Sequence, residues 1–154
     1  MEKLPSGSEC FVCGRNNPFG LKMFFYREAK GSCFSNVTIP EQYQSYPGVT
    51  HGGVVAAILD EASGRAINAD PDLFMVTMEL TVRYRRPVPI EQPLKVVGTL
   101  LKRRGKVATA KGELFDLDGN LLAESSGMFV DLPQEQQAQM LEGMEGWRVY
   151  PDEE

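Results

Sequence analysis

The sequence is poor in several kinds of residue, and each shortage excludes a class of protein. It has one histidine and three cysteines among 154 residues, and an odd number of cysteines without a secretion signal does not suit a disulfide framework. No run approaches the roughly 18 apolar residues of a membrane-spanning helix, so we expect no membrane partner. The N-terminus, Met1-Glu2-Lys3-Leu4-Pro5, lacks the apolar segment of a signal peptide, which predicts a cytoplasmic protein.

Positive charge is also in short supply. Lysine and arginine total 16 against 21 acidic residues, for a net charge of −5. A nucleic-acid-binding protein usually shows a basic footprint, so we expect no nucleic-acid partner. The basic residues instead form two local clusters: Arg83, Arg85 and Arg86 in one, and Lys102, Arg103, Arg104 and Lys106 in the other.

What remains is an ordinary one-domain composition, with 42% hydrophobic residues. The pattern predicts the order β-β-α-β-β-β-β. Strands are expected at 21–29, 31–39, 74–86, 93–104, 106–116 and 120–132, and a helix at 53–69. Turns between the last four strands predict an antiparallel meander. Residues 54–59 are apolar on every side of the helix, so we expect an α+β fold whose sheet curls around it.

The chain divides into three parts on this pattern. Residues 1–20 are expected to form a loop that contains the stretch Cys10-Phe11-Val12-Cys13-Gly14, and residues 21–132 form the main domain. Residues 133–154 are expected to hold a short amphipathic helix and an acidic tail. The spacing of Cys10 and Cys13 suits a metal knuckle, but a second such pair is missing. Cys33 and His51 could complete a zinc site only by a coincidence of the fold, so we expect a tight turn and no metal.

The start of the predicted helix has features of a catalytic site. Gly52 and Gly53 carry no side chains, so a ligand can approach their backbone N–H groups. These first N–H groups have no intrahelical partners and lie at the positive end of the helix dipole. They form a candidate oxyanion hole, although the glycines could also serve only a tight turn.

Two acids follow in the middle of this apolar helix. Glu61 and Arg65 are spaced four residues apart and are expected to pair. Asp60 has no such partner, and a carboxylate among apolar residues is costly unless it is paired or used. Gly52 and Asp60 are about 12 Å apart along a helix, so one ester group cannot touch both. A two-fold dimer could bring Asp60 of one chain to Gly52 of the other.

These residues resemble a known family. The stretch "HGGVVAAILDEA" resembles the core motif of the hotdog-fold acyl-CoA thioesterases, which belong to the 4-hydroxybenzoyl-CoA thioesterase superfamily, and in particular their PaaI-like, phenylacetate-pathway branch. The stretch "VTMELTVRYRRPV" and the element order are also similar, over roughly residues 20–132. The resemblance implies a hotdog fold, hydrolysis of an acyl-CoA to the free acid and CoA, and no cofactor.

The resemblance also implies roles for individual residues. The N–H of Gly52 would polarise the thioester carbonyl, with Gly53 beside it, and Asp60 of the partner chain would act as general base or nucleophile. Thr77 would hold the water or the acid. His51 would bond to nearby backbone at the substrate end of the helix. Glu61 is a rival to Asp60, because related hotdog branches use a glutamate from this helix.

The binding groups follow from the same resemblance. Members often place a polar side chain before the His-Gly-Gly, and here Gln44 or Ser45 would have to serve. Arg83, Arg85 and Arg104 could bind the phosphates of CoA, although a solvated strand rim explains them equally well. The two clusters could lie at opposite ends of the strands. A homodimer or a dimer of dimers is expected. The acyl pocket is expected to depend on the packing of six side chains: Phe24, Phe25, Tyr43, Tyr46, Phe74 and Met78.

Two rival interpretations remain. A hotdog dehydratase needs a catalytic histidine that acts with an acid. The single histidine, His51, lies at the start of the helix and not inside it, which argues against this interpretation. A non-catalytic acyl-CoA or lipid-binding module would keep the fold and bind without turnover.

Overall fold

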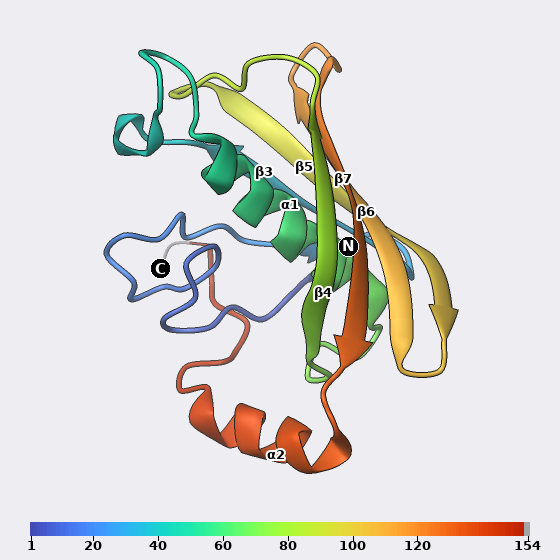
Figure 1. Cartoon of the computed structure of the whole chain (residues 1–154). Helices are drawn as coiled ribbons and strands as arrows, with labels where there is room; N and C mark the ends of the chain where they lie inside the picture. The colour runs from blue at the N-terminus through green and yellow to red at the C-terminus, as the bar shows by residue number, and fades with distance from the viewer. Residues whose placement is uncertain (153–154) are drawn as a thin grey trace.

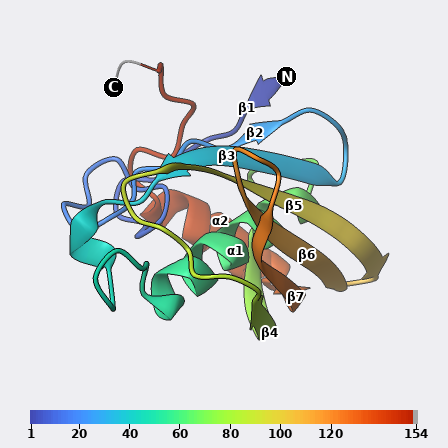
Figure 2. The same ribbon diagram turned by 90° about the horizontal axis from the view of Figure 1, so that it is seen from above.

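A single antiparallel sheet forms the frame of the protein in a computed structural model, which describes residues 1–152. Its order is β1-β2-β3-β5-β6-β7-β4. The strands are β1 (Glu2–Lys3), β2 (Tyr26–Arg27), β3 (Ser32–Thr38), β4 (Met75–Tyr84), β5 (Pro93–Arg104), β6 (Val107–Asp116) and β7 (Leu121–Asp131). Helix α1 (Gly52–Ile67) crosses one face of the curved sheet (Figures 1 and 2). The predicted α+β hotdog fold is therefore confirmed.

The last three strands form the expected meander, in which β5 pairs with β6 and β6 with β7. The first strand of the predicted four-stranded meander, 74–86, corresponds to β4 and has a different neighbour. β4 pairs with β7 at the edge of the sheet, not with β5. The segment between β4 and β5 contains Pro87 and Pro89, which do not suit a two-residue hairpin turn. It crosses from the edge to the middle of the sheet, and on the way Pro89 pairs with Val49.

The first predicted strand, 21–29, shrinks to the two residues of β2. Lys22 takes a positive φ of 52°, which interrupts an extended strand. The N–H groups of Leu21 and Met23 donate to the carbonyls of Phe11 and Val12. This stretch therefore pairs with the N-terminal loop and not with a neighbouring strand.

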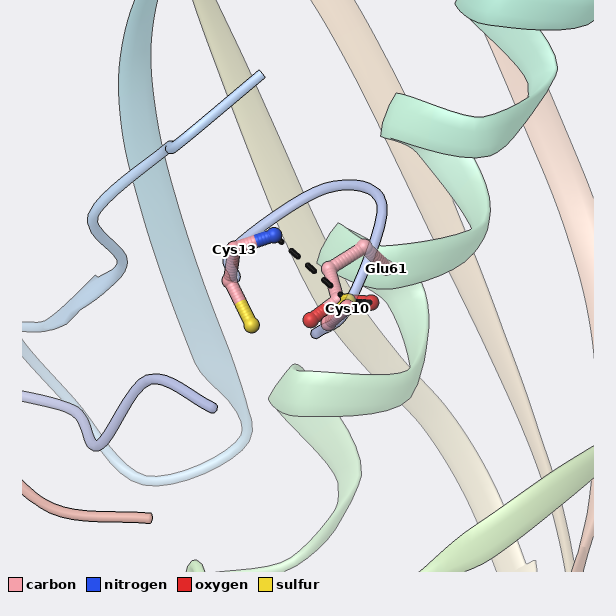
Figure 3. Close-up of side chains that lie close together, drawn as sticks. All are labelled: Cys10, Cys13 and Glu61. Carbon is pink, nitrogen blue, oxygen red and sulfur yellow. Dashed lines mark hydrogen bonds between the residues drawn. The ribbon is translucent and has the colours of Figure 1, made fainter. Parts of the chain in front are cut away.

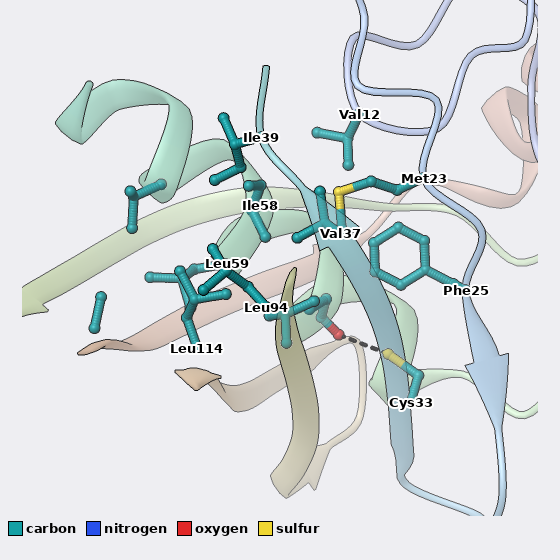
Figure 4. Close-up of a cluster of buried hydrophobic side chains, with 14 of the residues drawn as sticks. Val12, Met23, Phe25, Cys33, Val37, Ile39, Ile58, Leu59, Leu94 and Leu114 are labelled. Carbon is teal, nitrogen blue, oxygen red and sulfur yellow. Dashed lines mark hydrogen bonds between the residues drawn. The ribbon is translucent and has the colours of Figure 1, made fainter. Parts of the chain in front are cut away.

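The core lies between α1 and the sheet, as Figure 4 shows for part of it. Ile58, Leu59 and Ala62 of α1 have no exposed surface. The helix lies so close to β5 that a Cβ at Gly98 would be 1.9 Å from the carbonyl oxygen of Ala62. Side chains from the N-terminal loop, including Val12 and Cys13, are buried in the same cluster.

The C-terminal end of α1 is held by an arginine from β2. The guanidinium of Arg27 donates to the carbonyls of Arg65, Asn68 and Ala69 at 2.6–3.1 Å. Arg65 lies in the last turn of α1 and Asn68 is its C-cap, so their carbonyls are left without partners at the negative end of the helix dipole, and Ala69 directly follows the cap. Arg27 therefore caps the helix from the neighbouring sheet.

A second helix, α2 (Gln134–Gly143), follows the sheet, close to the predicted 133–143. It lies beyond the end of β7 (Figure 1). The side-chain amide of Gln137 exchanges hydrogen bonds with the backbone of Phe74, and the indole of Trp147 donates to Asp72 at 2.7 Å. No helix within residues 1–152 is long and apolar enough to cross a membrane.

Candidate active site

The start of α1 is capped by the single histidine. Nδ1 of His51 accepts a hydrogen bond from the N–H of Gly53 at 2.9 Å, which is the predicted contact with nearby backbone. The hydroxyl of Tyr84 donates to the carbonyl of Gly52 at 2.6 Å. The N–H of Gly52 itself has no hydrogen-bond acceptor among residues 1–152. Of the two glycine N–H groups proposed for an oxyanion hole, only that of Gly52 is thus left for a ligand.

Asp60 lies on α1 opposite the edge strand β4. Its Oδ1 accepts a hydrogen bond of 2.7 Å from the hydroxyl of Thr77. Burial raises the pKa of Asp60 above its ordinary value; the Thr77 hydrogen bond opposes this rise, and the charge of Glu61 adds to it. A half-buried carboxylate with a raised pKa, oriented by a hydroxyl on another element, is a group suited to act as a base.

Glu61, the next residue along α1, meets Arg65, as its spacing predicts. The Nε of Arg65 donates to Oε1 of Glu61 at 2.7 Å. Burial alone lowers the pKa of Arg65, but the charges of Glu61 and Cys13 and the hydrogen bonds to them together outweigh burial, so the pKa rises and the guanidinium stays charged. The carboxylate of Glu61 is therefore held in an ion pair, whereas Asp60 has only a neutral hydroxyl.

A cavity of about 250 Å³ opens beside these two acids. Asp60, Glu61 and Thr77 line it, and most of its remaining wall is apolar. Of the six pocket residues expected from the sequence, only Phe74 lines it. The sequence pattern did not indicate the apolar wall, because its residues come from widely separated segments: Leu4, Leu73, Met75, Phe129, Met144 and Trp147.

The structure does not bring Gly52 into this cavity. Gly52 is the first residue of α1 and Asp60 the ninth, and only Asp60 lines the cavity. Within one chain, the free N–H of Gly52 and the carboxylate of Asp60 are separated by about 12 Å of helix. A site that uses both groups therefore needs a second chain.

The two basic clusters lie at opposite ends of the sheet. Arg83 pairs in register with Glu124 near the start of β7, and Arg104 lies opposite Val107, which faces Val130 near its end. Arg85 makes an ion pair with Glu124 at 3.0 Å. A ligand bound along the sheet of one chain therefore cannot contact both basic clusters.

The loop before α1 uses its polar side chains internally. Oε1 of Gln44 accepts from the N–H of Gly48 at 3.0 Å, and the hydroxyl of Ser45 lies 3.5 Å from the carbonyl of Val49. Ser45 is exposed and is not among the residues that line the cavity.

The three cysteines are free thiols in two different settings. Cys33 is buried, which raises its pKa to about 12, and it donates to the carbonyl of Ala62. Hydrogen bonding by the Cys13 side chain lowers the pKa of Cys10 to about 7, and the same contact, together with burial, raises the pKa of Cys13 far above its ordinary value. Glu61 lies beside this pair (Figure 3), although no spacing in the sequence indicates this contact.

Comparison with known proteins identifies the family. A family model described as the thioesterase superfamily matches residues 47–123, which include the start of α1, Asp60 and Thr77. The chain belongs to this superfamily. A putative esterase of Saccharolobus solfataricus is 27% identical over 71% of this chain and 78% of its own length. The acyl-coenzyme A thioesterase THEM4 of Mus musculus is 28% identical over 60% of this chain, which spans only 40% of that relative.

Solved structures of superfamily members share the fold. A thioesterase superfamily protein is 34% identical with a TM-score of 0.72, over 79% of this chain and 62% of that one. The PaaI protein of E. coli is 18% identical with a TM-score of 0.67, over 73% and 81% of the two chains. A Streptococcus mutans protein bound to acetyl-CoA is 15% identical with a TM-score of 0.63, over 70% and 86%. The last two likenesses show the fold alone, and the PaaI-like branch is one of several neighbours.

Proposed function

We propose that this chain hydrolyses the thioester of an acyl-CoA, with Asp60 as the catalytic acid–base residue. The observation that carries the proposal is the hydrogen bond from Thr77 to Asp60 beside an apolar cavity. Oδ1 is occupied by Thr77, and Oδ2 has no hydrogen-bond partner among the described residues, so Oδ2 is available to a water molecule. The names of the superfamily and of the THEM4 relative support the class of reaction.

The proposed reaction uses few groups. Oδ2 of Asp60 takes a proton from a water molecule, whose oxygen attacks the thioester carbon. The oxyanion that forms accepts a hydrogen bond from the N–H of Gly52 at the positive end of α1. The tetrahedral intermediate then releases the CoA thiolate, which recovers the proton from Asp60, and leaves the free acid. Asp60 as a nucleophile is the other route that this geometry permits.

This mechanism requires a dimer, which we place at the β4 edge. β4 has a neighbour, β7, on one side only. Its side chains Val76, Met78 and Tyr84 are 43–58% exposed. An open edge with exposed apolar side chains favours pairing with a second chain. Pairing there brings a second α1 toward the cavity, and it gives two equal sites by symmetry.

In this proposal the acyl group of the substrate binds in the cavity, and its CoA moiety binds on the protein surface outside the cavity. The acetyl-CoA bound by the Streptococcus mutans neighbour supports a CoA thioester as the ligand. We propose that Arg83 and Arg85 contact its phosphates, since Arg83 lies on the edge strand that also carries Thr77 and Arg85 directly follows that strand. Arg104 lies at the other end of the sheet and would serve only through a second chain. The PaaI-like branch and a cytoplasmic location remain part of this proposal.

The test is release of free thiol from short, long and aromatic acyl-CoAs. Wild type is compared with Asp60→Asn and with Glu61→Gln, the same change at the neighbouring acid. We expect turnover by wild type and a loss of about 100-fold or more in Asp60→Asn, with a smaller loss in Glu61→Gln. If wild type binds acyl-CoA but releases no thiol, the chain is a binding module and the proposal is wrong.

A further inference from the structure

We propose that Cys10, Cys13 and Glu61 form a binding site for a thiophilic divalent cation, zinc by preference. One ligand atom of each lies within 4.8 Å of the other two, in the part of the chain that the structure describes (Figure 3). Zinc is held by sulfur at about 2.3 Å and by carboxylate oxygen at about 2.0–2.2 Å. Small side-chain movements close the observed separations to a tetrahedral site. Metal binding by these three residues does not require the proposed thioester hydrolysis.

The loop is built to hold the two sulfurs together. The N–H of Gly14 donates to the carbonyl of Cys10 at 2.8 Å and closes the turn. A Cβ at Gly14 would lie 2.3 Å from that carbonyl oxygen, so only glycine fits after Cys13. The N–H of Cys13 points at Sγ of Cys10, at 3.5 Å. Backbone N–H groups directed at a sulfur favour its thiolate form, which is the form that binds metal.

The third ligand is supplied by α1 and is already oriented. Arg65 holds Oε1 of Glu61, while Oε2 faces Sγ of Cys10 at 3.9 Å. The other two nitrogens of the guanidinium donate to Sγ of Cys13 at 3.0 Å and to the carbonyl of Pro5 at 2.8 Å. Each ligand residue thus has a neighbour that fixes it, as surrounding hydrogen bonds do in established metal sites.

The charges of the cluster also suit a divalent cation. Two thiolates and one carboxylate carry three negative charges, zinc carries two positive charges, and the guanidinium of Arg65 carries one. The occupied site is therefore neutral, which matters because an unbalanced charge beside a core is costly. Arg65 opposes the incoming cation directly, but its hydrogen bonds favour the deprotonated ligands that the cation requires.

The ligand set indicates which metal binds and where its open position lies. Thiolates select zinc over magnesium or calcium, which prefer oxygen ligands only. Three protein ligands leave a fourth position for water or another small ligand. Cys10, Cys13 and Glu61 line the same cavity as Asp60, so that position is reached from the cavity.

The experiment uses reduced, chelator-treated full-length protein titrated with Co²⁺ and then with Zn²⁺. We expect one Co²⁺ per chain, with thiolate-to-cobalt charge-transfer absorption and the strong visible bands of a tetrahedral site, and stoichiometric displacement by Zn²⁺. X-ray absorption of the zinc-loaded wild type should show two sulfurs at about 2.3 Å and one or two oxygens at about 2.0–2.2 Å. These readouts do not depend on enzymatic activity.

Matched variants assign the ligands. Cys10→Ser is expected to abolish the charge-transfer absorption, and Glu61→Gln to weaken Co²⁺ binding tenfold or more. Cys33→Ala removes the thiol outside the cluster, and Asp60→Asn the neighbouring acid; both should bind as wild type does. The proposal is overturned if wild type binds no Co²⁺, if Cys33→Ala loses the absorption equally, or if oxidised glutathione joins Cys10 to Cys13 in a protein that takes up no metal.

Discussion

Replacing Thr77 with valine tests whether its hydrogen bond holds Asp60 ready as a base. The change keeps the branched shape of the side chain and removes only the hydroxyl, which lies 2.7 Å from Oδ1 of Asp60. That hydrogen bond opposes the rise in the pKa of Asp60 that burial causes. Its loss should therefore raise the pKa further, and the acid limb of the pH–activity profile should move to higher pH.

The size of the effect follows from the charge of the acceptor. A hydrogen bond to a charged group contributes about 1.5–3 kcal/mol, and the half-buried Asp60 belongs at the lower end of that range. We expect kcat/KM to fall about tenfold on the acid limb, since 1.36 kcal/mol is a factor of ten, and less on the plateau, where Asp60 is ionised in both proteins.

The assay is thiol release from the best acyl-CoA across the pH range. Thr81→Val makes the same chemical change four residues further along β4 and should leave the acid limb where it is in wild type. An acid limb that stays in place in Thr77→Val, or that moves to lower pH, would refute the reasoning.

Three further predictions concern stability. Because the pKa of Asp60 is raised in the folded protein, its ionisation destabilises the fold, and Asp60→Asn should raise the free energy of unfolding in urea at pH 7. The gain should vanish below about pH 3, well under the pKa of about 3.9 that aspartate has in the unfolded chain, because the carboxyl is then neutral in both states. Arg27→Met should cost about 2–4 kcal/mol, because it leaves three carbonyls at the end of α1 uncapped, and Arg27→Lys should recover only part of this loss. Gly98→Ala should cost about 3 kcal/mol or more, because its Cβ meets the Ala62 carbonyl; Gly143→Ala, with nothing within 4 Å, should lie within about 0.5 kcal/mol of wild type.

Much of the fold follows from local patterns in the sequence. The alternation of side chains and the turn residues predicted β5 as 93–104 and α1 as 53–69, within two residues of the observed bounds. The Glu61–Arg65 pair followed from helical spacing alone. The contact between Thr77 and Asp60 was expected only from the family resemblance, because residues 17 positions apart carry no local signal of proximity.

The remaining features depend on contacts between distant segments. The pairing of β4 with β7 could not be read from the chain order, since turn signals indicate where a strand ends and not which neighbour it takes. Trp147 reaches the cavity only because the segment after α2 folds back toward α1. Cys10 and Glu61 are 51 residues apart, and no spacing in the sequence indicated that they meet.

Mixing two inactive variants tests the central claim most directly. Gly52→Pro removes the proposed oxyanion donor at a helix position that tolerates proline, and Asp60→Asn removes the base. A mixed dimer carries one site with both native groups, provided that Gly52 and Asp60 act across two chains. Thiol release by an equal, re-equilibrated mixture should reach about one quarter of wild type, because half of the dimers are mixed and each has one working site. A mixture of folded dimers that stays as inactive as its two components would contradict the account.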